Sequence, residues 1–272
     1  MIRVMFFGDV VGEPGRDTFQ AAVAALKAEH QPDFIVVNGE NAAGGRGITP
    51  KIAIELMRYG ADVITLGDHA WDQREILPYF ETEPRLIRPY NFPPGVPGEG
   101  SVVVSGNGKK LGVLNALGNT FMGPSVDNPF LTIKERVTRL REETPAVLLD
   151  FHAEATSEKI AMGRFLDGTA SIVVGTHTHV QTADDRILPG GTAYLTDAGY
   201  TGGHDSVIGR DVESVLQKYQ TLLPNRFHIA KNGCQADGLV ADLDEATGHA
   251  VRLQRLQWQP PDIAPEEESA PA

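Results

Sequence analysis

Short apolar runs alternate along this chain with segments whose apolar residues recur at helical spacing. The apolar runs predict strands at Arg3–Phe7, Phe34–Val37, Val63–Leu66, Ser101–Ser105, Lys110–Leu114, Ala146–Phe151 and Ile172–Val174. The helical spacing predicts helices at Asp17–His30, Ile52–Tyr59, Gln73–Tyr79, Ile133–Glu142 and Ser157–Leu166. After residue 174 we expect several shorter β segments, the last at Gly238–Leu243 and His249–Gln257. This alternation is typical of an α/β domain with a largely parallel or mixed sheet.

Turn-forming and disorder-promoting residues interrupt this pattern at a loop, a hairpin turn and the C-terminal tail. The stretch Arg85–Gly100 is rich in proline and glycine and predicts a loop, and Gly106-Asn107-Gly108-Lys109 predicts a hairpin turn. Residues 1–258 therefore form one predicted domain. Residues 259–272 combine proline and glutamate with little apolar content, so we expect a disordered tail.

Charge and composition narrow the classes of function. Of the 272 residues, 41% are hydrophobic and 22% are charged, which is ordinary for a globular protein. The formal net charge of −12 argues against a surface that coats DNA or RNA, because phosphate backbones are held by excess lysine and arginine. It does not argue against a small phosphorylated substrate, since bound metal ions can reverse the sign of a local site.

The number of cysteines and the lengths of the apolar runs indicate the cellular compartment and whether the chain could span a membrane. The single cysteine, Cys234, excludes an intramolecular disulfide and a metal site built from cysteines. The first apolar run meets Asp9 too soon for a signal peptide, and no run approaches the roughly 18 residues that span a bilayer. We expect a cytoplasmic protein without membrane association.

Five predicted strands end in potential metal ligands. These ends read Phe7-Gly8-Asp9, Asn38-Gly39-Glu40-Asn41, Gly67-Asp68-His69, Asp150-Phe151-His152 and Gly175-Thr176-His177-Thr178-His179. In open α/β sheets, ligands bind beyond the carboxyl ends of the strands. Glycine precedes the ligand in four of the five ends, which would let the backbone turn sharply toward the site. If the strands are neighbours, three carboxylates, one amide and four imidazoles converge.

Charge then dictates the chemistry. Three carboxylates in one place repel one another unless cations neutralise them, and two divalent ions bridged by a carboxylate at about 3.5–4 Å would do so. Mixed nitrogen and oxygen donors without thiolates suit Fe, Mn, Zn or Co better than Ca or Mg. Such a pair of ions can generate hydroxide from water and stabilise a phosphoryl group during in-line attack.

Each ligand has a simpler interpretation when taken alone. Asp9 could cap the following helix, and His69 could be a hydrogen-bonded structural histidine. The pair His177 and His179 is harder to dismiss, because residues two apart in an extended segment share a face. His204 lies in a glycine-rich loop and stays unassigned. The occurrence of ligands at five strand ends favours the metal site.

These residues resemble the calcineurin-like metallophosphoesterases, specifically their YmdB-like branch. The matching blocks lie between residue 7 and about residue 210, and they are Phe7-Gly8-Asp9-Val10-Val11-Gly12, Asn38-Gly39-Glu40-Asn41-Ala42, Gly67-Asp68-His69-Ala70-Trp71-Asp72, Asp150-Phe151-His152-Ala153-Glu154, Gly175-Thr176-His177-Thr178-His179-Val180-Gln181 and Leu195-Thr196-Asp197-Ala198-Gly199. The resemblance implies a four-layer αββα sandwich: two mixed β-sheets flanked by helices, with the site at the carboxyl ends of the strands.

The resemblance also implies the roles of the site residues. Glu40 would bridge two metals; Asp9 and His179 would hold one, and Asp68, His152 and His177 the other. Where the wider superfamily has a histidine this chain has Val11, and Asn41 would substitute as a ligand. His69 would face the substrate as general acid. The implied activity is phosphodiesterase action on 2′,3′-cyclic nucleotides with iron or manganese.

One position departs from the branch, which usually has asparagine where this chain has Asp68. Three carboxylates against two divalent cations leave a charge of about +1, whereas an asparagine ligand leaves about +2. We hypothesise that the second metal binds more tightly here but is a weaker Lewis acid.

Two other functional classes stay open at this point. A TIM-barrel amidohydrolase also builds a dinuclear centre, but its His-x-His lies on the first strand, whereas His177 and His179 come last among the ligands. A regulator could instead use the metals structurally while binding RNA ends or a partner protein, yet a closed structural site has no use for His69. The native metal, the preference for diesters or monoesters, and a possible homo-oligomer are not determined by the sequence.

Overall fold

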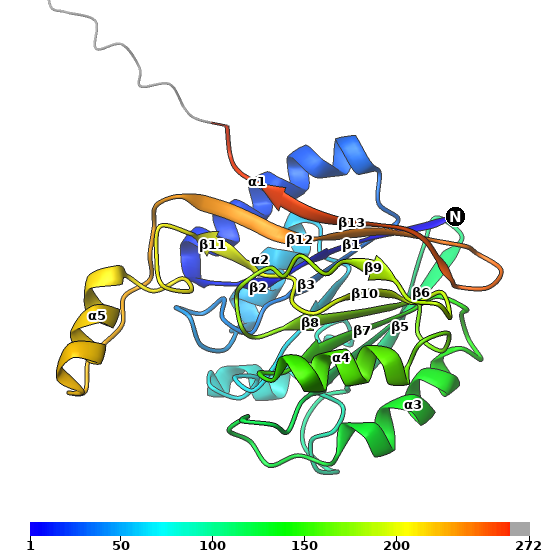
Figure 1. Ribbon diagram of the computed structural model, residues 1–272, viewed down its shortest axis with the longest axis horizontal. Helices are drawn as coiled ribbons and strands as arrows, with labels where there is room; N and C mark the ends of the chain where they lie inside the picture. The colour runs from blue at the N-terminus through cyan, green and yellow to red at the C-terminus, as the bar shows by residue number, and fades with distance from the viewer. Residues whose placement is uncertain (262–272) are drawn as a thin grey trace, which may run out of the picture.

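The structure is a computed structural model that describes residues 1–261. Residues 262–272, most of the predicted disordered tail, lie outside the described residues, and the extent of the single domain stays a prediction. Two β-sheets pack face to face, with helices on both outer faces (Figure 1). No helix among residues 1–261 combines the length and apolar character needed to cross a bilayer.

The first sheet has seven strands in the order β2-β11-β12-β1-β3-β4, with β13 also paired to β12. Its strands are β1 (Ile2–Phe7), β2 (Asp9–Val10), β3 (Phe34–Asn38), β4 (Val63–Thr65), β11 (Tyr200–Gly203), β12 (Cys234–Leu243) and β13 (Ala250–Trp258). The neighbours β1, β3 and β4 are parallel, whereas β12 runs antiparallel to β1. The strands that precede Asp9, Glu40 and Asp68 therefore end at one edge of this sheet.

The second sheet has six strands in the order β5-β6-β7-β8-β10-β9. Its strands are β5 (Ser101–Gly106), β6 (Lys109–Leu117), β7 (Val147–His152), β8 (Ile172–Thr176), β9 (Arg186–Ile187) and β10 (Ala193–Leu195). The four inner strands are parallel, and the predicted hairpin joins β5 to β6. Because β7 and β8 are adjacent and parallel, His152 and the His177–His179 segment leave the sheet together.

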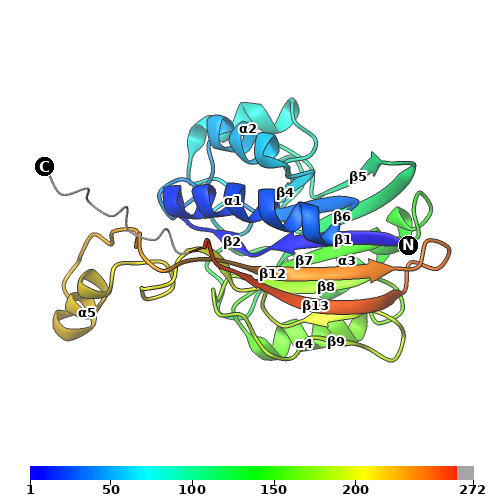
Figure 2. The same ribbon diagram turned by 90° about the horizontal axis from the view of Figure 1, so that it is seen from above.

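Helices cover the outer faces of both sheets. The described helices are α1 (Gly12–His30), α2 (Pro50–Tyr59), the 3-10 helix η1 (Arg74–Glu81), α3 (Pro129–Leu140), α4 (Thr156–Phe165) and α5 (Val212–Thr221), of which α5 covers neither sheet. Helices α1 and α2 lie on the outer side of the first sheet, while α3 and α4 lie on that of the second (Figures 1 and 2). Local sequence explains their ends: the Thr49 side chain accepts the Ile52 N–H at the start of α2, and Gly60 ends it in the left-handed conformation.

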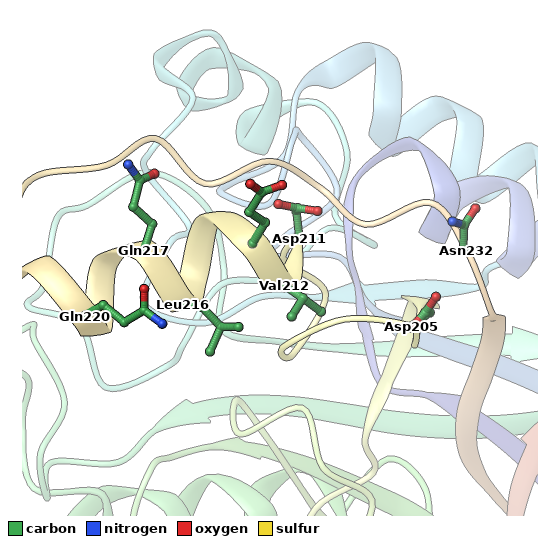
Figure 3. A pocket seen from close by; sticks show the side chains of 8 residues that line it. Asp205, Asp211, Val212, Leu216, Gln217, Gln220 and Asn232 are labelled. Carbon is green, nitrogen blue, oxygen red and sulfur yellow. The ribbon is translucent and has the colours of Figure 1, made fainter.

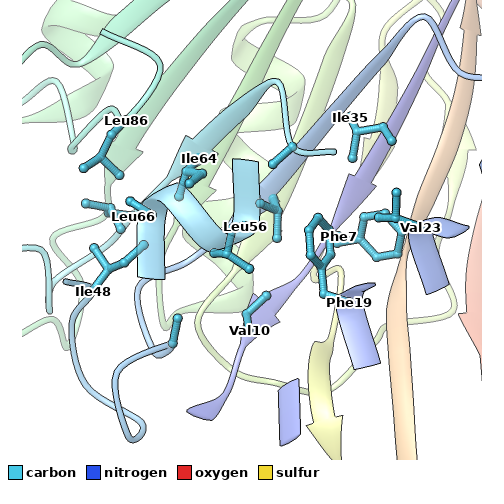
Figure 4. Packing of buried hydrophobic residues seen from close by; sticks show 14 of the residues in the cluster. Phe7, Val10, Phe19, Val23, Ile35, Ile48, Leu56, Ile64, Leu66 and Leu86 are labelled. Atoms are coloured by element: carbon cyan, nitrogen blue, oxygen red, sulfur yellow. The ribbon is translucent and has the colours of Figure 1, made fainter. Parts of the chain in front are cut away.

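Three apolar layers hold the sandwich together. The first, between α1, α2 and their sheet, includes Phe7 and Phe19, whose rings meet edge to face at 5.1 Å (Figure 4). The second lies between the two sheets and includes Phe6 and Leu148. The third joins the second sheet to α3 and α4. These layers confirm the αββα fold, and the two mixed sheets exclude the eight-stranded barrel of the amidohydrolase alternative.

The helices differ from the prediction in several places: α3 begins at Pro129 rather than at Ile133, and the helix predicted at Gln73–Tyr79 is the 3-10 helix η1. Helix α1 begins at Gly12 rather than at residue 17, because Pro14 is well tolerated in a first turn that has no partners for its N–H groups. Helix α5 was not predicted, because only several shorter β segments were expected after residue 174. Asp211 accepts the Ser214 N–H and caps this helix, which stands apart from the sandwich in both views (Figures 1 and 2).

Candidate metal centre

The two sheets bring the predicted ligands together at one end of the sandwich. Atoms of Glu40, Asp68, His152 and His177 lie within 4.8 Å of one another, close enough to hold a metal ion. The imidazole Nε2 of His152 is 3.2 Å from both Glu40 Oε1 and Asp68 Oδ1. The Nδ1 of His177 is 3.0 Å from the same His152 nitrogen. We call these four residues the Glu40 cluster.

A second group adjoins the Glu40 cluster and contains Asp9, Asn41 and His179. The Nε2 of His179 lies 3.1 Å from Asn41 Oδ1 and 4.0 Å from Asp9 Oδ1. Asp9 links the two groups, because its Oδ2 accepts the backbone N–H of His177. All seven residues predicted as metal ligands are thus brought together: four follow β1, β3 or β4, His152 is the last residue of β7, and two follow β8.

The second group also has an arrangement that fits a cation. Within residues 1–261, Asp9 Oδ1 is buried without a hydrogen-bond partner. His179 Nδ1 faces the Ile208 carbonyl, which can only accept, so the neutral ring carries its lone pair on Nε2. Asn41 donates its amide to the Gly45 carbonyl and turns Oδ1 to that lone pair. Two acceptors aimed at one point beside an unpaired carboxylate oxygen are what a bound cation would satisfy.

Electrostatics support the same conclusion. Burial raises the pKa of Asp9 to about 7, and the neighbouring Glu40 and Asp197 carboxylates add to this shift. Burial lowers the pKa of His179 to about 4, so this imidazole is neutral at pH 7, as a metal ligand must be.

The Glu40 cluster is held by opposite charges. Burial alone would lower the pKa of His152, but Glu40 and Asp68 outweigh it and raise this pKa well above its ordinary value. The imidazoles in turn outweigh burial at the two acids, so the pKa values of Glu40 and Asp68 lie below their ordinary values. A bound cation would supply the positive charge that a proton on His152 otherwise provides.

Neighbouring side chains orient the imidazoles. Thr176 Oγ1 gives its only proton to Asp150 Oδ1 and therefore accepts from His152 Nδ1 at 2.8 Å, which leaves His152 Nε2 toward the Glu40 cluster. Glu154 Oε2 lies 3.3 Å from His177 Nε2, on the side of the ring opposite the cluster. Sequence reasoning assigned no role to these three partners, because they are recognised only when β7 and β8 are placed side by side.

His69 lies beside the Glu40 cluster. Its backbone N–H donates to Glu40 Oε2, while its side chain stays partly exposed. Its Nδ1 is 3.1 Å from Asp72 Oδ2, and Arg46 Nε is 2.9 Å from that same oxygen. The spacing of three residues between His69 and Asp72 was the available sequence signal for this pair.

The glycines before the ligands act differently from the prediction. Gly8 and Gly67 do not have positive φ angles, so a sharp left-handed turn was the wrong reason for them. A Cβ at Gly67 would overlap the Glu40 carboxylate and the His152 ring, and one at Gly8 would overlap the Gly199 carbonyl. These glycines are needed because other groups pack directly against the backbone.

Two features at this end of the molecule fall outside the seven predicted ligands. His204, unassigned from sequence, stacks on Tyr200 at 4.1 Å, and Tyr200 stacks on His179 at 5.3 Å. A cavity of about 770 Å³ lies beside α5, lined by residues such as Asp211, Leu216 and Asn232 (Figure 3). None of its lining residues belongs to the seven predicted ligands, so the chemistry must be sought at the strand ends.

Comparison with known proteins agrees with the geometry. Residues 5–256 match the family described as YmdB-like protein. A 2′,3′-cyclic-nucleotide 2′-phosphodiesterase of Bacillus subtilis is 50% identical over 94% of this chain and 96% of its own length.

Two solved structures are also similar across almost the whole chain. One, described as a novel phosphatase of Mycoplasma pneumoniae, has a TM-score of 0.88 at 35% identity and covers 94% of this chain and 93% of its own. The other, a hypothetical protein of Thermus thermophilus, has a TM-score of 0.87 at 38% identity and covers 94% of this chain and 99% of its own. The family match over nearly all described strands and helices confirms the resemblance inferred from the motifs: the chain belongs to the YmdB-like family.

Proposed function

We propose that this protein is a metal-dependent phosphoric ester hydrolase that opens 2′,3′-cyclic nucleotides or closely related phosphodiesters. The observation that carries the proposal is the meeting of nitrogen and oxygen donors from two sheets, four of them within 4.8 Å of one another, beside an Asp9 oxygen that is buried without a hydrogen-bond partner among residues 1–261. The similarity to the Bacillus subtilis phosphodiesterase supports the substrate class.

The proposed ligand sets follow the two groups of residues. Asp9, Asn41 and His179 would hold one divalent ion, Asp68, His152 and His177 the other, and Glu40 would be shared. Imidazole and carboxylate donors without thiolate suit Fe, Mn, Zn or Co, and the resemblance to the YmdB-like branch favours iron or manganese among these. Such ions, when bound, lower the pKa of water and offset the charge on a phosphoryl group.

His69 is the proposed proton donor. Its ring is partly exposed at the edge of the Glu40 cluster, where a leaving ribose oxygen could reach it. In the reaction a water oxygen forms a bond to phosphorus and loses a proton to solvent, the bond from phosphorus to the ribose oxygen breaks, and His69 delivers a proton to that oxygen. Asp72 Oδ2, 3.1 Å from Nδ1, orients the ring.

The test combines metal analysis with hydrolysis of a 2′,3′-cyclic nucleotide. Wild type should carry metal, lose turnover on treatment with a chelator and regain it with Mn²⁺ or Fe²⁺. Glu40→Gln should lose most turnover, because the carboxylate shared between the two sites is gone. The matched control is Glu135→Gln on the exposed surface of α3, which should behave as wild type. Equal turnover by Glu40→Gln and wild type would remove the shared carboxylate from the mechanism.

A further inference from the structure

The segment that carries the two last ligands has an unfavourable backbone conformation. His177 and His179 have φ angles of 98° and 62°, in the region that residues with a Cβ rarely adopt. Such conformations persist only where the surroundings impose them, and they cluster at functional sites. The contacts of Thr178, between the two histidines, show what imposes them here.

Thr178 is tied to the buried carboxylate of Asp197. Asp197 Oδ2 accepts the Thr178 backbone N–H at 3.2 Å and its Oγ1 hydroxyl at 2.7 Å. The other oxygen of Asp197 accepts the Gly199 N–H at 2.9 Å, which fixes the carboxylate in turn. Asp197 is fully buried and is not among the proposed ligands.

A lysine from α4 reaches the same oxygen. Lys159 Nζ donates to Asp197 Oδ2 at 2.6 Å, and the Lys159 side chain is 2% exposed. Its aliphatic part passes Gly175 on β8, where a Cβ would lie 2.9 Å from Lys159 Cδ. An apolar side chain would cover β8 without the cost of burying a charge, so packing alone does not account for this ion pair.

We propose that Lys159, Asp197 and Thr178 are positioning residues for the metal centre. The ion pair holds Thr178 by two hydrogen bonds, and Thr178 in turn holds His177 and His179 in their left-handed conformations. The result is that His177 Nδ1 and His179 Nε2 point to two adjacent groups of donors rather than to solvent. This inference rests on the proposed role of both histidines as ligands.

The cleanest test uses the hydroxyl of Thr178, which is partly exposed. Thr178→Val keeps the shape and the backbone hydrogen bond but removes the hydrogen bond from the hydroxyl to Asp197, while Thr178→Ser keeps both. Mn²⁺ affinity is measured by competition with a chelator, and the bound ion is followed by its EPR spectrum. Thr178→Val should bind Mn²⁺ about 10–100-fold more weakly than wild type, and Thr178→Ser should bind it nearly as wild type does. At saturating Mn²⁺ the kcat of Thr178→Val should largely recover.

A second variant tests the ion pair itself. Lys159→Met should also weaken Mn²⁺ binding and alter the EPR spectrum. Asp242→Asn is the control, because it breaks the ion pair between Asp242 and Arg3, residues of β12 and β1 that are not among the proposed ligands. It should lower thermal stability without changing Mn²⁺ affinity. If Lys159→Met does not fold, the two Thr178 variants decide.

The inference is overturned if Thr178→Val and Lys159→Met bind Mn²⁺ as tightly as wild type, whatever happens to their melting temperatures. It is also overturned if Thr178→Ser loses as much affinity as Thr178→Val. A wild-type protein that binds no Mn²⁺, Fe²⁺, Zn²⁺ or Co²⁺ would instead contradict the proposed function, and with it the ligand roles on which this inference rests.

Discussion

The two sheets contribute different chemistry to the same site. The first sheet supplies only oxygen donors, from Asp9, Glu40, Asn41 and Asp68, whereas the second supplies only imidazoles, from His152, His177 and His179. Neither half is a site by itself, because the oxygen half carries uncompensated negative charge and the imidazole half carries no anion among its ligands. The centre therefore exists only when the two sheets are packed together.

The halves also differ in how their pKa values respond to burial. The pKa of Asp9 is raised to about 7 because its charge is buried among other acids. Burial lowers the pKa of His179 to about 4, while the acids around His152 raise the pKa of that imidazole. Identical residue types within one site therefore differ in protonation because of their neighbours. A substitution can thus change the oxygen donors or the imidazoles separately.

The strongest way to break the imidazole half is His152→Ala. This change leaves Glu40 and Asp68 without their buried partner, so the free energy of unfolding without metal should fall by about 3–5 kcal/mol. Turnover of a 2′,3′-cyclic nucleotide should fall roughly 10⁴-fold or more, because loss of an ion removes several kcal/mol of transition-state stabilisation. Urea denaturation and metal counting check both effects. The control His228→Ala changes an exposed histidine. Wild-type metal content in His152→Ala would contradict the proposed ligand set.

His69→Ala tests the one imidazole that follows the oxygen-bearing sheet. The metals should remain bound while kcat falls about 10²–10⁴-fold, the usual contribution of a general acid. Asp72→Asn should lower kcat less than His69→Ala does, because Asp72 only orients the His69 ring. Steady-state kinetics with parallel metal analysis measure both variants. Unchanged kcat in His69→Ala would favour the metal-containing binding protein over the enzyme.

Asp68→Asn sharpens the charge difference between the halves. Removing one negative charge from the Glu40 cluster should weaken Mn²⁺ binding about tenfold, because His152 and His177 then share one acid fewer. Turnover at saturating metal should stay the same or rise, since the ion becomes a stronger Lewis acid. Chelator competition and kcat are the readouts. Tighter Mn²⁺ binding would refute the charge argument.

The smallest effect is expected at Asp237, a buried acid of the first sheet that is not a proposed ligand. Burial raises its pKa from 3.8 to about 7, so the folded state favours the protonated acid. Its stabilising contribution is complete below about pH 4 and is lost as the pH rises through 7. Between pH 6 and 8 Asp237 alone should lower the free energy of unfolding by about 1 kcal/mol, so wild type should lose about that much more than Asp237→Asn. The free energy of unfolding is measured by urea titration at both pH values. If Asp237 is not responsible, it will change by the same amount in wild type and in Asp237→Asn.

The sequence was most informative where function depends on local patterns. Apolar runs ending in Asp9, Glu40, Asp68, His152 and His177 predicted both the strands and the residues that meet at their ends. The motif blocks predicted the fold and the family, which the structure and the comparisons confirm.

Long-range contacts could not be predicted in the same way. The ion pair of Lys159 and Asp197, and the hydrogen bond from Thr176 to Asp150, join residues 38 and 26 positions apart that become neighbours only in the packed sheet. Helix α5 was missed although Val212, Val215, Leu216 and Tyr219 recur at helical spacing; in the structure only Val215 of these four is buried. The glycines that precede the ligands were recognised in the sequence. The reason that no side chain fits there, which is the close packing of distant groups against the backbone, could not be predicted.

The apolar layer between the two sheets carries a consequence for ion selection. Phe6 and Leu148 are fully buried there, and their bulk sets how far apart the sheets stand. Because the proposed oxygen donors lie on one side of that gap and the proposed nitrogen donors on the other, the thickness of this layer sets the distance between the two halves of the proposed centre. A substitution that changes the bulk of Phe6 or Leu148 is therefore expected to change that distance, at residues that are not among the proposed ligands.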